Sequence, residues 1–260
     1  MQNIFRWFLL LSFFLSLFVW VFYQPETPQY FVKIQPSNIK PIEFPAVTNK
    51  NEQIQTFQAD LNIVLSYRFF KISATATLFM EKPKNFRLLV YKNDKEMDLG
   101  SNDVCFWYWT KKNKTVFFGN YSDYPNIDLK ATLNPVWIME SLGLHKIENF
   151  ESFQTEKYII YSQTIKINNE NIKRIIFVQK DINAIIGSYV LDEKETIISS
   201  IEIIEFYESK DFFIPKTILI LYPEENINME WRFENIKLNG PMDKNLWNKP
   251  YSEFETNLKY

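Results

Sequence analysis

Residues 81–109, EKPKNFRLLVYKNDKEMDLGSNDVCFWYW, carry the strongest fold signal in the chain. The dipeptide Lys82-Pro83 precedes a strand-like run at 86–91 that begins with Phe86. A polar turn at 92–95 follows, and then the tetrad 100–103 (GSND), whose residue types tolerate the dihedral angles of a tight turn. An aromatic run at 106–109 ends the stretch. The pattern predicts a three-stranded antiparallel meander.

The third of these strands is aromatic at successive positions, among them Trp107 and Trp109. Successive residues of a strand point to opposite faces of the sheet. We therefore expect both faces of this strand to be buried, and another part of the chain to cover the sheet.

Bulk composition limits the class of protein. The 260 residues are 46% hydrophobic and 17% aromatic, which predicts one sizeable domain, or two small ones, with a large packed core. The formal net charge of −2 argues against nucleic-acid binding, because nucleic-acid binders are usually basic. Cys105 is the only cysteine, so an internal disulfide is impossible.

The N-terminal segment predicts contact with a membrane. Residues 7–23 are apolar apart from two serines and would form a helix of about 25 Å, slightly short of a bilayer core. The segment suits a signal peptide or a membrane anchor, and the absence of small residues at its end favours an uncleaved anchor. Arg6 predicts a cytoplasmic N-terminus. The five prolines in 24–49 predict an extended linker, followed by a domain over 50–260.

Most of the remaining chain alternates between apolar and polar residues, the period of half-buried strands. Several of these runs are joined by short polar loops. Serial hairpins of this kind describe a mainly β protein with an antiparallel sheet, because parallel strands would need crossover helices. The predicted strands lie at 57–65, 72–80, 115–120, 158–167, 172–179, 184–191, 196–207, 214–222 and 227–233.

One helix is predicted in the domain, over residues 135–142. Asn134 is a suitable N-cap, Pro135 fits the first helical position, and Gly143 is a suitable stop. An apolar face includes Ile138, Met139 and Leu142. Two interpretations stay open, a lid over an apolar cavity and a helix that fills the core permanently.

The residues also predict which chemistry to expect. His145 is the only histidine, no Cys/His cluster has zinc-ligand spacing, and no glycine-rich phosphate loop occurs. Glu202 and Glu205 are close in sequence but on opposite faces of a strand, which does not favour acid–base catalysis. We therefore expect a protein without catalytic residues, metal or cofactor.

The stretch that opens with Lys82-Pro83-x-x-Phe86 and ends in the Trp-rich strand resembles the LolA/LolB-type lipoprotein-carrier superfamily of the bacterial envelope. The closing segment at 235–250 also resembles the end of those proteins. The resemblance implies an unclosed half-barrel, a strongly curved antiparallel sheet with short helices across its mouth over an apolar cavity. The matching positions are Lys82, Pro83, Phe86, Arg87, 98–109, Asn239, Asp243, Trp247 and Pro250.

The resemblance implies a monomeric, non-enzymatic carrier or acceptor of lipid-modified or amphipathic cargo, whose periplasmic domain the N-terminal segment would anchor to the inner membrane. In the lipoprotein carrier, an arginine before the proline holds the lid. Lys82 stands there in this chain and cannot make the same planar bidentate contact. The alternative is a membrane-tethered protein-interaction or sensor module with a filled core. The expected acyl-chain site comprises Lys82, Phe86, Trp107, Trp109, Trp137, Ile138, Met139, Leu142 and Trp231.

Overall fold

The computed structural model describes residues 50–112, 114–120, 134–145, 147, 150–167, 170–208, 212–250 and 254–257. All of them belong to the unit that spans 39–260. The predicted anchor at 7–23 and linker at 24–49 lie outside the described residues. Within the described ranges, no helix combines the length and the apolar character needed to cross a bilayer.

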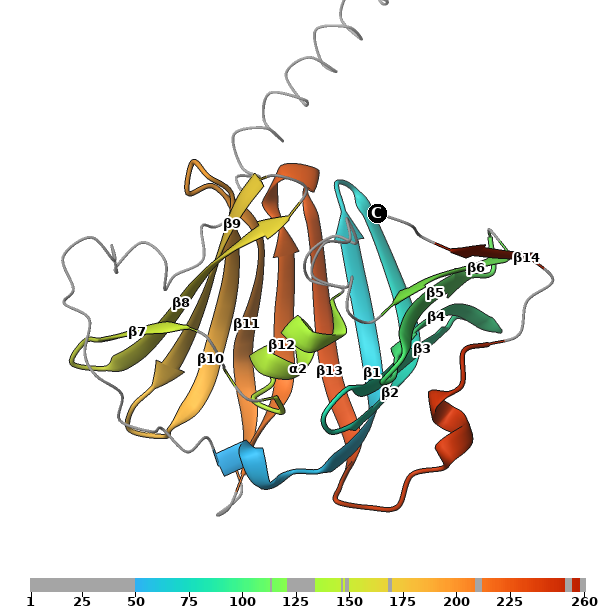
Figure 1. The fold of residues 1–260 in the computed structure, drawn as a ribbon, viewed down its shortest axis with the longest axis horizontal. Coiled ribbons are helices and arrows are strands. Elements are labelled where there is room, and N and C mark those ends of the chain that lie inside the picture. Colours follow the sequence, from blue (N-terminus) through green and yellow to red (C-terminus); the bar gives the residue numbers. More distant parts are fainter. Residues whose placement is uncertain are drawn as a thin grey trace, which may run out of the picture. The chain divides into compact units, whose positions relative to one another are not determined.

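The described residues form one curved, open sheet, an unclosed half-barrel built from two meanders (Figure 1). The first meander comprises β1 (Thr56–Tyr67), β2 (Phe70–Glu81), β3 (Asn85–Tyr91), β4 (Lys95–Ser101), β5 (Cys105–Thr110) and β6 (Thr115–Asn120). The second comprises β7 (Glu151–Gln154), β8 (Tyr158–Ile167), β9 (Glu170–Gln179), β10 (Ala184–Leu191), β11 (Ile197–Glu208), β12 (Phe213–Tyr222) and β13 (Ile227–Leu238).

Antiparallel pairing of β1 with β13 joins the two meanders into one sheet. At one edge, the short strand β14 (Phe254–Asn257) pairs in parallel with β6. The mainly β, antiparallel fold predicted from the alternating pattern is confirmed. The short elements η3 (Lys50–Gln53), η6 (Pro223–Glu225), η7 (Lys244–Trp247) and the helix α2 (Pro135–Ser141) complete the described structure.

The meander of residues 81–109 is confirmed as β3, β4 and β5, with one correction to its second turn. Gly100 and Ser101 belong to β4, and the turn consists of residues 102–104. This strand position is a glycine because the indole of Trp107 lies across it. A Cβ added there would be 2.2 Å from Trp107 Cζ2. The side chain of Asn102 shapes the turn by accepting hydrogen bonds from the backbone N–H groups of Val104 and Cys105.

The main hydrophobic core lies on the face of the sheet that α2 covers, which we call the inner face (Figure 1). Alternate residues of the strands point into it, as their sequence pattern predicted. Those of the central strands include Ala59, Leu61, Ile63, Leu78, Met80, Phe86, Leu88, Trp231 and Phe233.

On the opposite, outer face, η7 lies against β3 and the turn after β4, where Arg87 and Asn102 donate to the carbonyl oxygens of Leu246 and Trp247. Phe106 and Trp107, neighbours on β5 that point to opposite faces, are both fully buried. The expectation that both faces of this strand are buried is therefore confirmed.

Candidate functional site

Helix α2 begins at Pro135, as the sequence predicted, and ends at Ser141, one residue before the predicted end. The side chain of Asn134 accepts a hydrogen bond of 3.2 Å from the backbone N–H of Trp137, which makes Asn134 the N-cap. Pro135 occupies the first helical turn, and Gly143 has φ of 70°, the left-handed conformation that ends a helix without steric strain.

The apolar face of α2 packs into the core. Ile138, Met139 and Leu142 are 0%, 1% and 2% exposed, and they share one apolar cluster with Phe86 and Trp231. The structure thus brings together five of the residues that the sequence analysis assigned to an acyl-chain site.

A buried ion pair connects α2 to the sheet on its other side. Glu140 of α2 pairs with Arg174 of β9, and both side chains are 7% exposed. The Arg174 guanidinium lies over the ring of Trp137 at 4.4 Å and near the ring of Phe150 at 5.3 Å. Burial lowers the pKa of Arg174, and the Glu140 carboxylate opposes that shift. Removing one member would leave an uncompensated buried charge, at a cost of about 3–5 kcal/mol.

Two polar contacts fix the C-terminal end of α2. The hydroxyls of Ser141 on α2 and Ser188 on β10 lie 2.6 Å apart and share a hydrogen bond. Asn51, a buried residue of η3, donates from its side-chain amide to the carbonyl oxygens of Leu142 and of Phe213. Asn51 therefore ties the end of α2 to η3 and to β12.

Lys82 is connected to α2 through Asn51. Its Nζ donates to the backbone carbonyl oxygen of Asn51 at 3.4 Å. The side-chain charge that contacts α2 directly comes from Arg174, which sequence reasoning did not single out. Its only sequence signal is a basic residue of β9 that lies between Ile172 and Ile176 on the same face of the strand.

The space beside α2 is small. A cavity of about 10 Å³ lies between the helix and strands β9 to β11, room for about one water molecule. Its polar lining includes Ser141, Arg174, Ser188 and Ser200. In this arrangement α2 itself occupies the inner face, which both the lid and the permanently filled core predict for a closed molecule.

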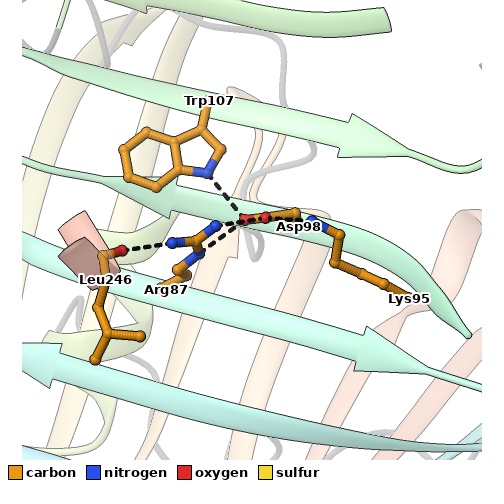
Figure 2. Close-up of polar contacts among 5 residues, drawn as sticks. All are labelled: Arg87, Lys95, Asp98, Trp107 and Leu246. Carbon is orange, nitrogen blue, oxygen red and sulfur yellow. Dashed lines mark hydrogen bonds and ion pairs between the residues drawn. The ribbon is translucent and has the colours of Figure 1, made fainter. Parts of the chain in front are cut away.

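Trp107 and Trp109 lie on the outer face, away from α2, since they alternate with the buried Phe106 and with Tyr108, which packs against the main core. Figure 2 shows the surroundings of Trp107: its indole N–H donates to the buried Asp98 carboxylate at 3.0 Å. These two tryptophans are therefore left out of the candidate site.

Asp98 is the centre of this outer-face cluster. Arg87 contributes two hydrogen bonds of 3.2 and 2.8 Å, and Lys95 Nζ a third of 3.1 Å (Figure 2). Arg87 also donates to the carbonyl oxygen of Leu246 in η7 at 2.7 Å. The polar residues of the stretch 81–109 thus hold the outer covering in place rather than contact α2.

Within the described ranges, no group of three or more His, Cys, Asp or Glu side chains is arranged to hold a metal ion.

A further feature of the inner face is the indole N–H of Trp231. It is buried and lacks a hydrogen-bond partner among the described residues, so this donor of the inner face is not satisfied in this arrangement.

Comparison with solved structures identifies the fold. The chain is similar to a DUF1329 family protein of Desulfovibrio piger, with a TM-score of 0.55 and 9% identity over 76% of this chain and 92% of that one. It is similar to a LolA superfamily protein of Nitrosomonas europaea, with a TM-score of 0.53 and 9% identity over 77% and 95% of the two chains. No family model matches the sequence, and neither does any curated protein.

A third similar structure is a putative outer membrane lipoprotein-sorting protein domain of Vibrio parahaemolyticus, with a TM-score of 0.50, 11% identity, and coverage of 76% of this chain and 92% of that one. The described domain therefore has a LolA-like fold, and the resemblance seen in residues 81–109 is confirmed at the level of the fold.

Proposed function

We propose that this protein is a carrier or acceptor of lipid-modified or amphipathic cargo in the bacterial cell envelope, with the acyl chains bound between α2 and the inner face of the sheet. The observation that carries the proposal is the position of α2. It is a two-turn helix on the inner face of a LolA-like sheet, and a few discrete contacts hold it there.

The energies are compatible with an exchange of helix for cargo. Exposing Ile138, Met139 and Leu142 costs roughly 1.5–3 kcal/mol for each side chain. An acyl chain of ~16 carbons buried in their place gains on the order of 10 kcal/mol before ordering costs, at about 0.8 kcal/mol per CH₂. Cargo can therefore offset the exposure of these three side chains, whereas water cannot.

Trp231 has a role in this proposal. A lipid-modified peptide carries ester and amide carbonyls beside its acyl chains. The buried, unpartnered indole N–H of Trp231 would donate to one of these carbonyls once α2 moves away. Phe86, which belongs to the same apolar cluster, would contact the chain itself.

The cellular setting is part of the same proposal. Residues 7–23 would hold the protein in the inner membrane and 24–49 would extend the domain into the periplasm, where the protein acts as a monomer. Catalysis, a metal and a cofactor have no part in it.

The second candidate function is a membrane-tethered interaction or sensor module with a filled core. It is favoured by the volume of the cavity beside α2, which is about 10 Å³ and too small for an acyl chain. The two functions differ in one respect: only the carrier needs α2 to leave the inner face.

A disulfide that locks α2 to the sheet tests this difference. The hydroxyls of Ser141 and Ser188 are 2.6 Å apart, so cysteines at these positions can form a disulfide with little backbone movement. We would use Ser141→Cys/Ser188→Cys in a Cys105→Ser background and measure uptake of a dansyl-labelled fatty acid, oxidised and reduced. The carrier binds the probe only when reduced.

The reduced protein is its own control for the two substitutions, and Ser141→Cys alone controls for the oxidant. Equal uptake by the locked and unlocked forms would contradict binding under α2. Absence of uptake in the reduced form and in the parent protein, together with a lack of lipid in mass spectra of the purified protein, would favour the filled-core module.

A further inference from the structure

On the side of β3, the hairpin of β1 and β2 extends beyond the neighbouring strand (Figure 1). The last pairing of β2 with β3 joins Thr75 to Tyr91, whereas β2 begins at Phe70. Five residues of β2, 70–74, therefore extend past β3. At about 3.4 Å per residue this is a projection of roughly 17 Å on that side.

The tip of this hairpin is apolar and exposed. Phe69 in the turn is 79% exposed, and Phe70 and Ile72 on β2 are 68% and 48% exposed. Phe70 and Ile72 are in line with Ala76 and Leu78, so they continue the inner-face stripe of β2 beyond the core. Phe69 is not part of that stripe, and the core therefore does not explain why an aromatic residue occupies the turn.

Cationic side chains flank the apolar tip. Arg68 lies over the ring of Tyr67 at 5.2 Å, and Lys71 is exposed on β2 between Phe70 and Ile72. Residues 67–73 contain two cations and no carboxylate. The neighbouring turns at the same end of the sheet carry charges of both signs: Lys92, Asp94, Lys112 and Lys114 on the β3 side, and Glu224 and Glu225 in the turn between β12 and β13.

We propose that the tip of the β1–β2 hairpin inserts into the interface of a phospholipid bilayer, with Phe69, Phe70 and Ile72 in the apolar zone and Arg68 and Lys71 at the headgroups. Apolar side chains that enter a membrane interface reach about 5–10 Å deep, which is less than the projection of the hairpin. Arginine and lysine bury their aliphatic stems while their charges stay in water or at phosphates.

A bilayer fits this surface better than a protein groove does. Phe69 lies in the turn, and Phe70 and Ile72 lie on the part of β2 that extends past β3, so the apolar side chains are exposed at the end of the sheet and β3 does not shield them. The carboxylates in the neighbouring turns limit the electrostatic attraction, so apolar insertion dominates and anionic lipid adds to it. The proposal does not depend on the carrier function, because it concerns a different end of the sheet from α2.

A fluorescent probe at the tip tests the proposal in the full chain. In a Cys105→Ser background, Phe69→Cys is labelled with nitrobenzoxadiazole and the protein is reconstituted into vesicles of phosphatidylethanolamine and phosphatidylglycerol. Val104→Cys, labelled in the same way, is the matched control, since Val104 is 73% exposed in a turn at the opposite end of the sheet. Reconstitution brings both probes to the membrane, so their difference reports the tip.

We expect the probe at 69 to brighten severalfold and to be quenched by doxyl-labelled lipid, and the probe at 104 to do neither. Adding Phe70→Ser/Ile72→Ser should lower the probe signal in vesicles with and without phosphatidylglycerol. Adding Arg68→Gln/Lys71→Gln should lower it only in the vesicles that contain phosphatidylglycerol. Equal behaviour of the two probes would overturn the proposal. So would brightening at 69 without quenching by lipid, which would mean that a protein surface, such as a second copy of the chain, covers the tip.

Discussion

Arg174 of β9 and Glu140 of α2 form an ion pair in which both side chains are almost fully buried. The pair connects the single described α-helix to the second meander of the sheet. A buried pair of this kind adds little net stability, because desolvation offsets the attraction between the charges. Its effect is to define where the helix sits, since either charge alone would be costly in the same place.

We predict that Arg174→Met destabilises the protein by about 3–5 kcal/mol, because Glu140 is left buried without its partner. The double variant Arg174→Met/Glu140→Leu should recover most of this loss. Urea unfolding of both variants and the parent measures the difference. Lys173→Met is the control: Lys173 pairs with the exposed Glu195, and its loss should cost no more than about 1 kcal/mol. A double variant as unstable as the single one would show that packing of Arg174, not its charge, matters.

We predict that Gly100→Ala destabilises the protein by about 1–3 kcal/mol, because the new methyl group overlaps the buried indole of Trp107. Displacing that indole also weakens its hydrogen bond to Asp98. Thermal melting measures the effect, and Gly240→Ala is the control, since nothing lies within 4 Å of a Cβ built there. Equal melting temperatures for the two variants would mean that the Trp107 ring moves aside without cost.

Gly100 also shows what the sequence could not predict. The strand bounds follow from alternation, which depends on neighbouring residues, and most were placed within a few positions. The turn was predicted two residues early because glycine before Ser101 and Asn102 resembles turn chemistry, and only the packed structure shows the Trp107 ring above it. Short strands such as β7 carry too few residues for a period to emerge.

The candidate site could likewise be predicted only in part, because local sequence signals do not identify long-range contacts. Helix α2 has local signals at both ends, in Asn134 and Gly143, so its bounds could be predicted. The ion pair of Arg174 with Glu140 of this helix is a long-range contact, and no local pattern identifies the partner of a buried charge. Trp109 was assigned to the site because the sequence predicted the meander but not which face of its third strand points toward α2.

Stability should fall with rising pH because of Glu202. Burial raises the pKa of its carboxyl above the usual value, and the hydrogen bond from the Tyr189 hydroxyl opposes this shift. The folded protein thus holds this proton more tightly than the unfolded chain does. The stabilisation is complete below the ordinary pKa, near 4.5, and is lost as the pH rises from there through the folded-state pKa.

Glu202→Gln cannot ionise, so its free energy of unfolding should lack this decline and exceed that of the parent at neutral pH. Urea unfolding from acidic to neutral pH measures it. Glu205→Gln is the control, because Glu205 is 53% exposed and pairs with Lys216 at the surface. Parallel pH profiles for the parent and Glu202→Gln would show that Glu202 does not contribute to the slope.

The double variant Ile138→Asp/Met139→Asp distinguishes a lid from a permanent part of the core. Both side chains are almost fully buried when α2 lies on the inner face, where two unpaired carboxylates would cost several kcal/mol each. The total stability of a domain is only roughly 5–15 kcal/mol. If α2 is a lid, as we propose, it escapes this cost by leaving the sheet. The variant then stays folded, melts cooperatively, and loses any lipid that co-purifies with the parent.

If the helix is a permanent part of the core, the variant does not accumulate as a folded protein. Thermal melting of the variant beside the parent, with bound lipid measured by mass spectrometry on both, separates these outcomes. A folded variant that retains its lipid would contradict both interpretations, because the acyl chains would then bind away from α2. The matched control is Val104→Asp/Ile204→Asp, because both side chains are apolar, lie outside α2 and are 73% and 54% exposed.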